Sequence, residues 1–153
     1  MLKGKTVVLG VTGCIAAYKA CEIVSSLKKK GATVIVIMTP HSTEFVQPLS
    51  FETLSGNRVI TDLFDRDFDF EVEHVALAKR ADVFVVAPAT ANTIGKIANG
   101  IADDMLTTTI MACKAPKIIC PAMNTNMYEN ENTTENIARL KKQGYKIIEP
   151  ISG

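Results

Sequence analysis

Several short segments of the sequence combine residue types that could bind a ligand. In GVTGCIAA, Gly10, Gly13 and Ala16 follow the spacing G-x-x-G-x-x-A. Small residues let the chain turn tightly into a helix, whose free N–H groups can bind a phosphate. The spacing differs from the G-x-G-x-x-G dinucleotide fingerprint, and NRVITDLF supplies no clear acidic partner for a ribose. A phosphate site and a closely packed strand-to-helix turn are equal alternatives here.

Hydroxyl side chains follow the apolar run that ends at Met38. In MTPHSTEF, Thr39 and Ser42 could contact a ligand, but Ser42 or Thr43 could equally cap a helix. Taken alone, this segment favours capping. His41 is expected to be a solvated loop histidine rather than a catalyst.

A third segment, APATANTIGKIANGIADDM, is rich in hydrogen-bonding groups. Thr90, Asn92 and Thr93 stand among alanines after an apolar run. Hydroxyls and amides suit a polar heterocycle or a phosphate, not proton abstraction. Asn92 or Thr93 could merely cap a helix, but three such side chains exceed what a cap needs. We therefore expect a binding site.

Two more segments offer a histidine and a carboxamide. His74 of EVEHVALAKRAD is expected to open a helix. A lone histidine is usually structural or surface-exposed, but His74 is the better candidate of the two histidines for a general acid or base. In PAMNTNMYEN, Asn124 could hold a carboxylate or phosphate without adding charge. The alternative is a helix start, with Asn124 or Thr125 as cap and Met123 and Met127 in the core.

Taken together, these residues predict a neutral, uncharged pocket for a phosphate-bearing planar cofactor, with one histidine near it. A mononucleotide such as FMN fits better than a dinucleotide, because one phosphate turn is evident and no acid for a ribose is.

The elements that must position these residues are short aliphatic runs that alternate with helix-length segments. In the first helical segment, Ile15, Tyr18, Ile23 and Leu27 lie near one face, and Gly31 ends it. Continuous β-branched runs predict a parallel sheet covered on both faces, in a doubly wound, Rossmann-like α/β fold of one domain. The predicted strands are Thr6–Val11, Thr33–Met38, Asp82–Pro88, Lys117–Pro121 and Tyr145–Pro150.

The segment between the second and third strands is less regular. Ser42–Asp69 predicts two short helices, a short strand near Arg58–Thr61 and a surface loop. After it, the helix begun at His74 is expected to turn Val75, Leu77 and Ala78 inward.

Composition limits the possible functions. The chain has 153 residues, 47% hydrophobic and 22% charged, with a formal net charge of +1, which argues against disorder and nucleic-acid or membrane binding. No run is long enough to span a membrane, and no signal peptide is evident. The four cysteines form no CxxC pair and indicate a reduced, cytoplasmic protein, while two histidines make a metal site improbable.

The blocks GVTGCIAAYK, EHVALAKRADVFVVAPATANTIGKIANGIADDML and PAMNTNMY occur in this order along the chain. In combination they resemble the homo-oligomeric flavin-containing cysteine decarboxylase family, in its coenzyme A branch, over essentially the whole chain. The resemblance implies a flavodoxin-like flavoprotein domain over residues 1–153. It also implies FMN-dependent oxidative decarboxylation of 4′-phosphopantothenoylcysteine to 4′-phosphopantetheine, redox-neutral overall, by a carboxy-lyase.

The resemblance also assigns roles to residues. His74 corresponds to the family's essential acid or base, Asn124 to the asparagine that binds the substrate carboxylate, and Met127 to a substrate contact. Cys14 would lie against the cofactor and is not expected to be a nucleophile. The implied cofactor contacts are Gly13, Cys14, Ile15, Thr39, His41, Thr90, Ala91, Asn92, Thr93 and Ala122.

The family further implies a trimer or dodecamer with flavin at the subunit contacts, and a fused or separate phosphopantothenate–cysteine ligase. Its decarboxylases carry a flap with a cysteine after the last strand. This sequence ends at EPISG, where that flap would begin, so we expect poor reduction of the enethiol intermediate. Alternatives are a decarboxylase of peptide C-terminal cysteines, a flavin prenyltransferase, against which PAMN argues, or a non-catalytic FMN-binding subunit.

Overall fold

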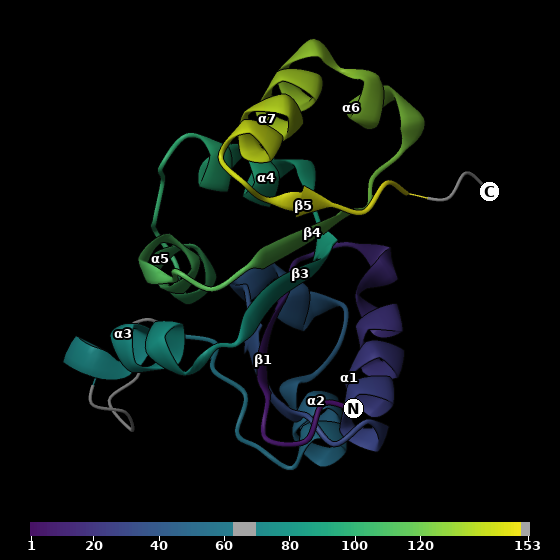
Figure 1. The fold of residues 1–153 in the computed structure, drawn as a ribbon. Helices are drawn as coiled ribbons and strands as arrows, with labels where there is room; N and C mark the ends of the chain where they lie inside the picture. The colour runs from purple at the N-terminus through teal and green to yellow at the C-terminus, as the bar shows by residue number, and fades with distance from the viewer. Residues whose placement is uncertain (63–69, 151–153) are drawn as a thin grey trace.

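The computed structural model describes residues 1–62 and 70–150 of the chain (Figure 1). A five-stranded parallel sheet has the order β2-β1-β3-β4-β5. The predicted α/β fold with a parallel sheet is therefore confirmed. The strands are β1 (Thr6–Val11), β2 (Thr33–Met38), β3 (Val83–Ala89), β4 (Lys117–Pro121) and β5 (Lys146–Ile147). The third strand is shifted by one residue from its predicted bounds, and the fifth is much shorter than predicted.

Helices cover both faces of the sheet. They are α1 (Ala20–Lys29), α2 (Pro48–Ser55), α3 (Phe70–Arg80), α4 (Ala91–Ala98), α5 (Met105–Ala112), α6 (Thr125–Glu129) and α7 (Glu131–Lys142), with 3-10 turns η1 (Ile15–Lys19) and η2 (Pro40–Glu44).

Alternate residues of each strand enter two separate cores. Val7 and Leu9 of β1 pack with residues of α1 and α2, whereas Val8 packs with residues of α3, α4, α5 and α7. Leu77 and Ala78 of α3 are buried as predicted, and Val75 is partly buried. Burial on both faces explains why the strands read as continuous apolar runs.

The prediction for the first helical segment is partly wrong. Ile15 and Tyr18 are 78% and 56% exposed, and Ala17, Ala20 and Val24 are the buried residues instead. The segment begins as the 3-10 turn η1, which has three residues per turn, so the face expected from an α-helical period rotates away from the core.

The irregular segment after β2 contains the two expected short helices, η2 and α2. The expected strand near Arg58–Thr61 is reduced to one parallel bridge between Ile37 and Ile60. The expected surface loop falls largely on residues 63–69, outside the described residues.

The strand order fixes the place where a ligand can bind. β1 lies between β2 and β3, and the chain leaves β1 towards α1 on one face but leaves β3 towards α4 on the other. Loops that diverge in this way open a crevice at the carboxyl ends of the strands.

Candidate functional site

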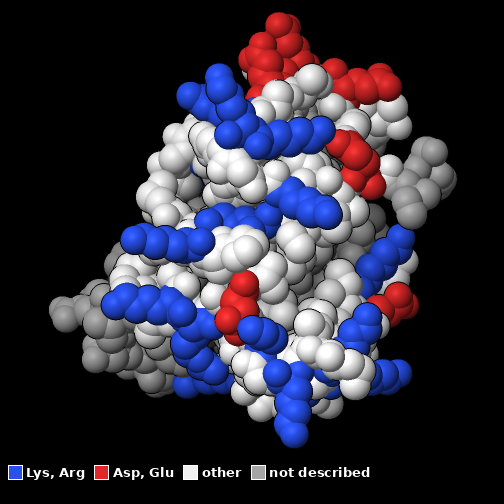
Figure 2. Space-filling view, viewed as in Figure 1, with Lys and Arg blue, Asp and Glu red and all other residues white. Residues whose placement is uncertain are grey.

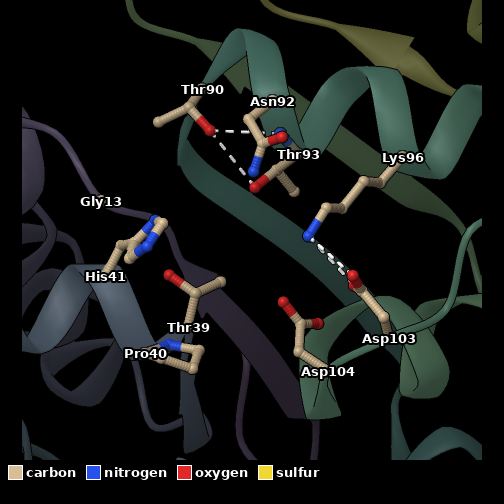
Figure 3. Close-up of a pocket in the computed structure, with 10 residues that line it drawn as sticks. All are labelled: Gly13, Thr39, Pro40, His41, Thr90, Asn92, Thr93, Lys96, Asp103 and Asp104. Carbon is tan, nitrogen blue, oxygen red and sulfur yellow. Dashed lines mark hydrogen bonds and ion pairs between the residues drawn. The ribbon is translucent and has the colours of Figure 1, made fainter.

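Two adjoining hollows lie at this crevice and share Gly13 and Thr90. The smaller, of about 260 Å³, is lined by Gly13, Thr39, Pro40, His41, Thr90, Asn92, Thr93, Lys96, Asp103 and Asp104 (Figure 3). The larger has a volume of about 820 Å³. Its lining includes Gly13, Cys14, Ile15, Ala16, Lys19, Pro88, Thr90, Cys120, Ala122, Met123, Asn124, Met127 and Pro150.

Gly13 is needed because two loops approach each other closely. A Cβ atom built on Gly13 would lie 2.7 Å from the Cβ of His41 and 3.0 Å from its carbonyl carbon. Real Cβ atoms essentially never approach another atom as closely as 2.7 Å, so any larger residue must push the two loops apart. Gly13 therefore allows the close approach of the two loops at the place where the hollows adjoin, which we call the joint.

The loop after β2 is held by capping, as predicted, but the cap is Thr39 rather than Ser42 or Thr43. Thr39 Oγ1 accepts a bond from Ser42 N at 3.3 Å, and Ser42 Oγ donates to the carbonyl of Thr39 at 2.7 Å. Thr39 N in turn donates to the carbonyl of Val11 at 3.0 Å. His41 is exposed, as expected, and lines the smaller hollow beside Gly13 (Figure 3).

The loop after β3 is capped by Thr90, so neither Asn92 nor Thr93 caps α4. Thr90 Oγ1 accepts a bond from Thr93 N at 3.2 Å and donates to Thr93 Oγ1 at 3.2 Å. Asn92 is exposed and its carboxamide points into the smaller hollow (Figure 3). The amide is thus available to a ligand rather than used to start the helix.

The prediction of an uncharged pocket is wrong, because four charged residues line the hollows. Lys96 Nζ lies 3.0 Å from both carboxylate oxygens of Asp103. Asp104 caps α5 by accepting a bond from Thr107 N at 2.8 Å. Lys19 lines the larger hollow. The two carboxylates are engaged locally, which limits their repulsion of an anion nearby.

Asn124 is the N-cap residue of α6, and its side-chain oxygen forms the capping hydrogen bond. Its Oδ1 accepts a bond from Met127 N at 2.9 Å, so the predicted cap at Asn124 is correct. Among the described residues, no partner for the two N–H donors of Nδ2 is found, and an aspartate cap would offer no such donors. Met127 is 45% exposed and lines the hollow rather than the core, whereas Met123 is partly buried against the core.

The predicted residues Cys14, Ile15 and Ala122 also line the larger hollow. Ala122 N donates to the carbonyl of Ala89 at 3.0 Å, which joins the ends of β3 and β4. The structure does not bring every predicted residue to the site. Ala91, the first residue of α4, and His74 line neither of the two hollows.

His74 is partly buried on α3, which packs against α5. In Figure 1, α3 lies at the left of the molecule and α6 at the upper right. Among the described residues, Nδ1 of His74 has no hydrogen-bond partner although the atom is buried. A buried polar atom without a partner is costly.

Three side chains near the larger hollow have altered acidity. Burial raises the pKa of the Cys120 thiol, so Cys120 is less readily ionised than an ordinary cysteine. Tyr128 of α6 donates a hydrogen bond to Glu149, which also pairs with Lys141 at 3.2 Å. That bond raises the pKa of Tyr128 to about 12, while Tyr128 first and then Lys141 lower the pKa of Glu149.

Sequence reasoning missed the charged lining residues and Thr12, which lies directly before Gly13. Lys19 follows the GVTGCIAA turn closely in sequence, which could have indicated a place near the site, but its position in a helical segment gave no reason to select it. Lys96, Asp103 and Asp104 stood within a block already favoured as a site. Their spacing alone does not indicate which of these side chains line the hollow.

The arrangement can bind an anion attached to a flat ring. The helix starts at Cys14 and Thr90 both face the joint of the hollows, and helix starts favour negative charge. The larger hollow adds apolar lining and the side-chain amide of Asn124.

No group of three or more potential metal ligands occurs in residues 1–62 and 70–150. In the same ranges, no helix is long and apolar enough to cross a membrane.

Curated relatives match the whole sequence. The chain is 50% identical over 153 residues to the coenzyme A biosynthesis bifunctional protein CoaBC of Bacillus subtilis, covering 100% of this chain and 38% of that protein. It thus spans well under half of this relative. It is 46% identical over 150 residues to the probable phosphopantothenoylcysteine decarboxylase of Streptococcus mutans, covering 97% of this chain and 84% of that protein.

Solved structures agree in fold. The FMN-dependent cysteine decarboxylase SpaF superposes with a TM-score of 0.92 at 34% identity, covering 100% of this chain and 88% of that one. A PPC decarboxylase mutant complexed with pantothenoylaminoethenethiol gives a TM-score of 0.82 at 32% identity, covering 96% and 82%. The sequence model of the Flavoprotein family matches residues 1–152. The chain therefore belongs to the Flavoprotein family.

Proposed function

We propose that the chain, as one flavoprotein domain, catalyses the FMN-dependent decarboxylation of 4′-phosphopantothenoylcysteine to 4′-phosphopantetheine in coenzyme A biosynthesis. The observation that carries this proposal is the larger hollow, which is lined both by the turn at Gly13 and Cys14 and by Asn124. The relatives named for this activity support it. The cytoplasmic location expected from cysteine usage belongs to the same proposal.

The phosphate of FMN would bind at the joint of the hollows, between Gly13 and Thr90. The residues there fit this group because Gly13 leaves no side chain in the way and two helix starts offer free N–H groups. Asn92 and Thr39 would bind polar atoms of the cofactor from the smaller hollow. When bound, FMN supplies the two-electron chemistry that makes the substrate's carboxylate a leaving group.

Asn124 would hold the substrate carboxylate through Nδ2. The carboxylate must stay ionised until it leaves as CO₂, and a neutral amide binds it without adding or accepting a proton. Met127, exposed at the same wall, would contact the apolar part of the substrate.

Lys19 gives a reason to prefer a phosphorylated substrate. It is exposed at the wall of the larger hollow, which Asn124 also lines. An ammonium group in the lining of that hollow would bind the terminal phosphate of 4′-phosphopantothenoylcysteine. A peptide carrying a C-terminal cysteine has no such phosphate.

We propose that the protein is a homo-oligomer, a trimer or dodecamer, in which a second copy supplies His74. Support comes from two observations: His74 lines neither hollow of its own chain, and its buried Nδ1 lacks a partner among the described residues. Brought to the hollow of a neighbour, the imidazole would exchange a proton with the substrate. A ligase domain, fused as in the bifunctional relatives or separate, would be the partner.

The purified protein tests the cofactor first. It should be yellow and release FMN on denaturation, and a colourless protein that takes up no added FMN would overturn the proposal. With FMN bound, CO₂ release from phosphopantothenoylcysteine should exceed release from a peptide ending in cysteine. The reverse preference would support the alternative of a peptide-cysteine decarboxylase.

The shared site is tested by mixing two inactive variants. His74→Asn and Asn124→Asp should each lose decarboxylation, and co-expression should restore part of it, because some sites then combine intact His74 with intact Asn124. No recovery in mixed oligomers would show that each chain uses its own histidine.

A further inference from the structure

Thr12 is a buried polar residue between β1 and the turn at Gly13. Its exposed fraction is 1%. A buried hydroxyl without partners would destabilise the fold, so its contacts should explain its presence.

The N–H and the side chain of Thr12 both bind the end of β3 and the residue that follows it. Thr12 N donates to the carbonyl of Pro88 at 3.3 Å, and Thr12 Oγ1 donates to the same carbonyl at 2.5 Å. The hydroxyl oxygen also accepts a bond from Thr90 N at 3.0 Å. One side chain thus uses its donor and an acceptor on a segment 76 to 78 positions away in sequence.

The hydroxyl of Thr12 forms its hydrogen bonds just beyond the last paired residues of β1 and β3. Regular pairing between β1 and β3 ends at Gly10 and Val86. Pro88 has no N–H to donate, and the pairing of β3 with β4 shifts register between Val86 and Ala89. A side chain from β1 that both donates and accepts can bridge this gap, and threonine is small enough to do so.

The two segments that Thr12 joins are the ones that meet between the hollows. Gly13 follows it directly, and Thr90, whose N–H it binds, caps α4. We propose that Thr12 is a positioning residue, which holds the Gly13 turn and the Thr90 cap at the separation that a phosphate-bearing ligand requires. This inference rests on the proposed function, because it takes the phosphate of FMN as that ligand.

Three variants test this role by affinity for FMN and for riboflavin, which lacks the phosphate. Thr12→Val keeps the shape but loses both hydroxyl bonds, and we expect FMN affinity to fall about tenfold or more. Thr12→Ser keeps the hydroxyl and should stay within about threefold of the wild type. Riboflavin affinity should change much less than FMN affinity in Thr12→Val.

Thr109→Val is the matched control. Thr109 is fully buried, and its hydroxyl donates to the carbonyl of Met105 within α5, at 2.7 Å. Its loss should lower the melting temperature but leave the FMN affinity of the folded protein unchanged. If folded Thr12→Val binds FMN as the wild type does, or if Thr109→Val loses as much affinity, the positioning role is wrong.

A measurement on the wild type covers the case in which Thr12→Val does not fold. The amide of Thr90 should be protected from hydrogen exchange in the FMN-free protein, because Thr12 Oγ1 holds it before any ligand binds. Rapid exchange there would overturn the inference. A wild type that binds no FMN would instead overturn the proposed function, so the two failures are distinguishable.

Discussion

The two ends of the crevice are built in different ways. At the end proposed for the cofactor, the loops after β1 and β3 are joined by the buried hydroxyl of Thr12 and by backbone groups. At the end proposed for the substrate, the partly buried Tyr128 of α6 and the exposed Lys141 of α7 both bind the exposed Glu149, which follows β5. Figure 2 shows acidic side chains gathered at the upper end of the molecule, over α6 and α7.

The difference concerns how firmly each end is fixed before a ligand arrives. Buried hydrogen bonds are costly to leave unmade, so the cofactor loops have one favoured arrangement. Exposed ion pairs contribute little and are screened by salt. We therefore expect a preorganised cofactor end and a more adaptable substrate end, and the following predictions test that contrast in order of expected effect.

The largest effect is expected for Asn124→Asp. Aspartate can still cap α6, so the fold should persist, but it places a negative charge where the substrate carboxylate would bind. Decarboxylation should fall about 100-fold or more, whereas FMN affinity should stay within about twofold. The neighbouring Asn126→Asp, exposed on the same helix, is the control and should retain most activity. Equal losses in the two variants would refute the carboxylate contact.

Gly13→Ala should damage the cofactor end. The added Cβ would meet His41 at 2.7 Å, so the turn must move away from the loop after β2. We expect FMN affinity to fall about 10- to 100-fold, as measured by flavin fluorescence. Gly95→Ala is the control, because its Cβ would lie 3.5 Å from the nearest atom and alanine favours the helix. Unchanged FMN affinity in Gly13→Ala would show that this loop can adapt.

Lys19→Gln should alter substrate choice at the adaptable end. The KM for phosphopantothenoylcysteine should rise about tenfold, because one charge-assisted contact to the phosphate is lost. The KM for the dephosphorylated analogue should hardly change. Lys29→Gln, at the far end of α1, should leave both values unchanged. A parallel rise for both substrates would show that Lys19 does not contact the phosphate.

Glu149→Gln should have the smallest effect on catalysis, with KM altered by less than about threefold. Its spectroscopic effect should be clear. Ultraviolet titration should show the pKa of Tyr128 falling from about 12 towards its ordinary value near 10, with Tyr128→Phe identifying the signal. A titration unchanged by the substitution would mean that Glu149 does not hold the phenol.

The hydrogen bond between Tyr128 and Glu149 stabilises the folded protein only within a limited pH range. The Glu149 pKa is lowered, so its contribution is present above the ordinary carboxyl range and is lost as pH falls through the folded-state value. The Tyr128 pKa is raised, so its contribution is present below about pH 10 and is lost as pH rises towards 12. Neutral pH therefore lies within the window.

Local chemistry made much of the fold predictable. Apolar runs such as Thr33–Met38 are strands in a doubly covered sheet because their continuous burial requires helices on both faces. The segments that follow the strands gather at one edge because parallel strands share a direction. Helix capping at Asn124 was also predictable, since it depends on a side chain and the next turn of the same segment.

Other features depend on contacts between distant segments. The inward face of Ile15 and Tyr18 was predicted wrongly because the segment begins as a 3-10 turn, whose period differs from that of an α-helix. The charged lining was missed because composition does not say which lysine or aspartate turns inward. His74 lines neither hollow of its own chain, which the histidine's sequence context did not indicate.

The sequence by itself determined the α/β fold class, the parallel sheet and the segments at its ligand-binding edge, because propensity, periodicity and capping act within a few residues. Only the tertiary structure decided that Gly13 faces His41, that Thr90 caps α4, and that Thr12 bridges two strands. The physical reason is distance along the chain. Contacts across 76 to 78 residues exist only after the sheet has formed, and no local pattern records them.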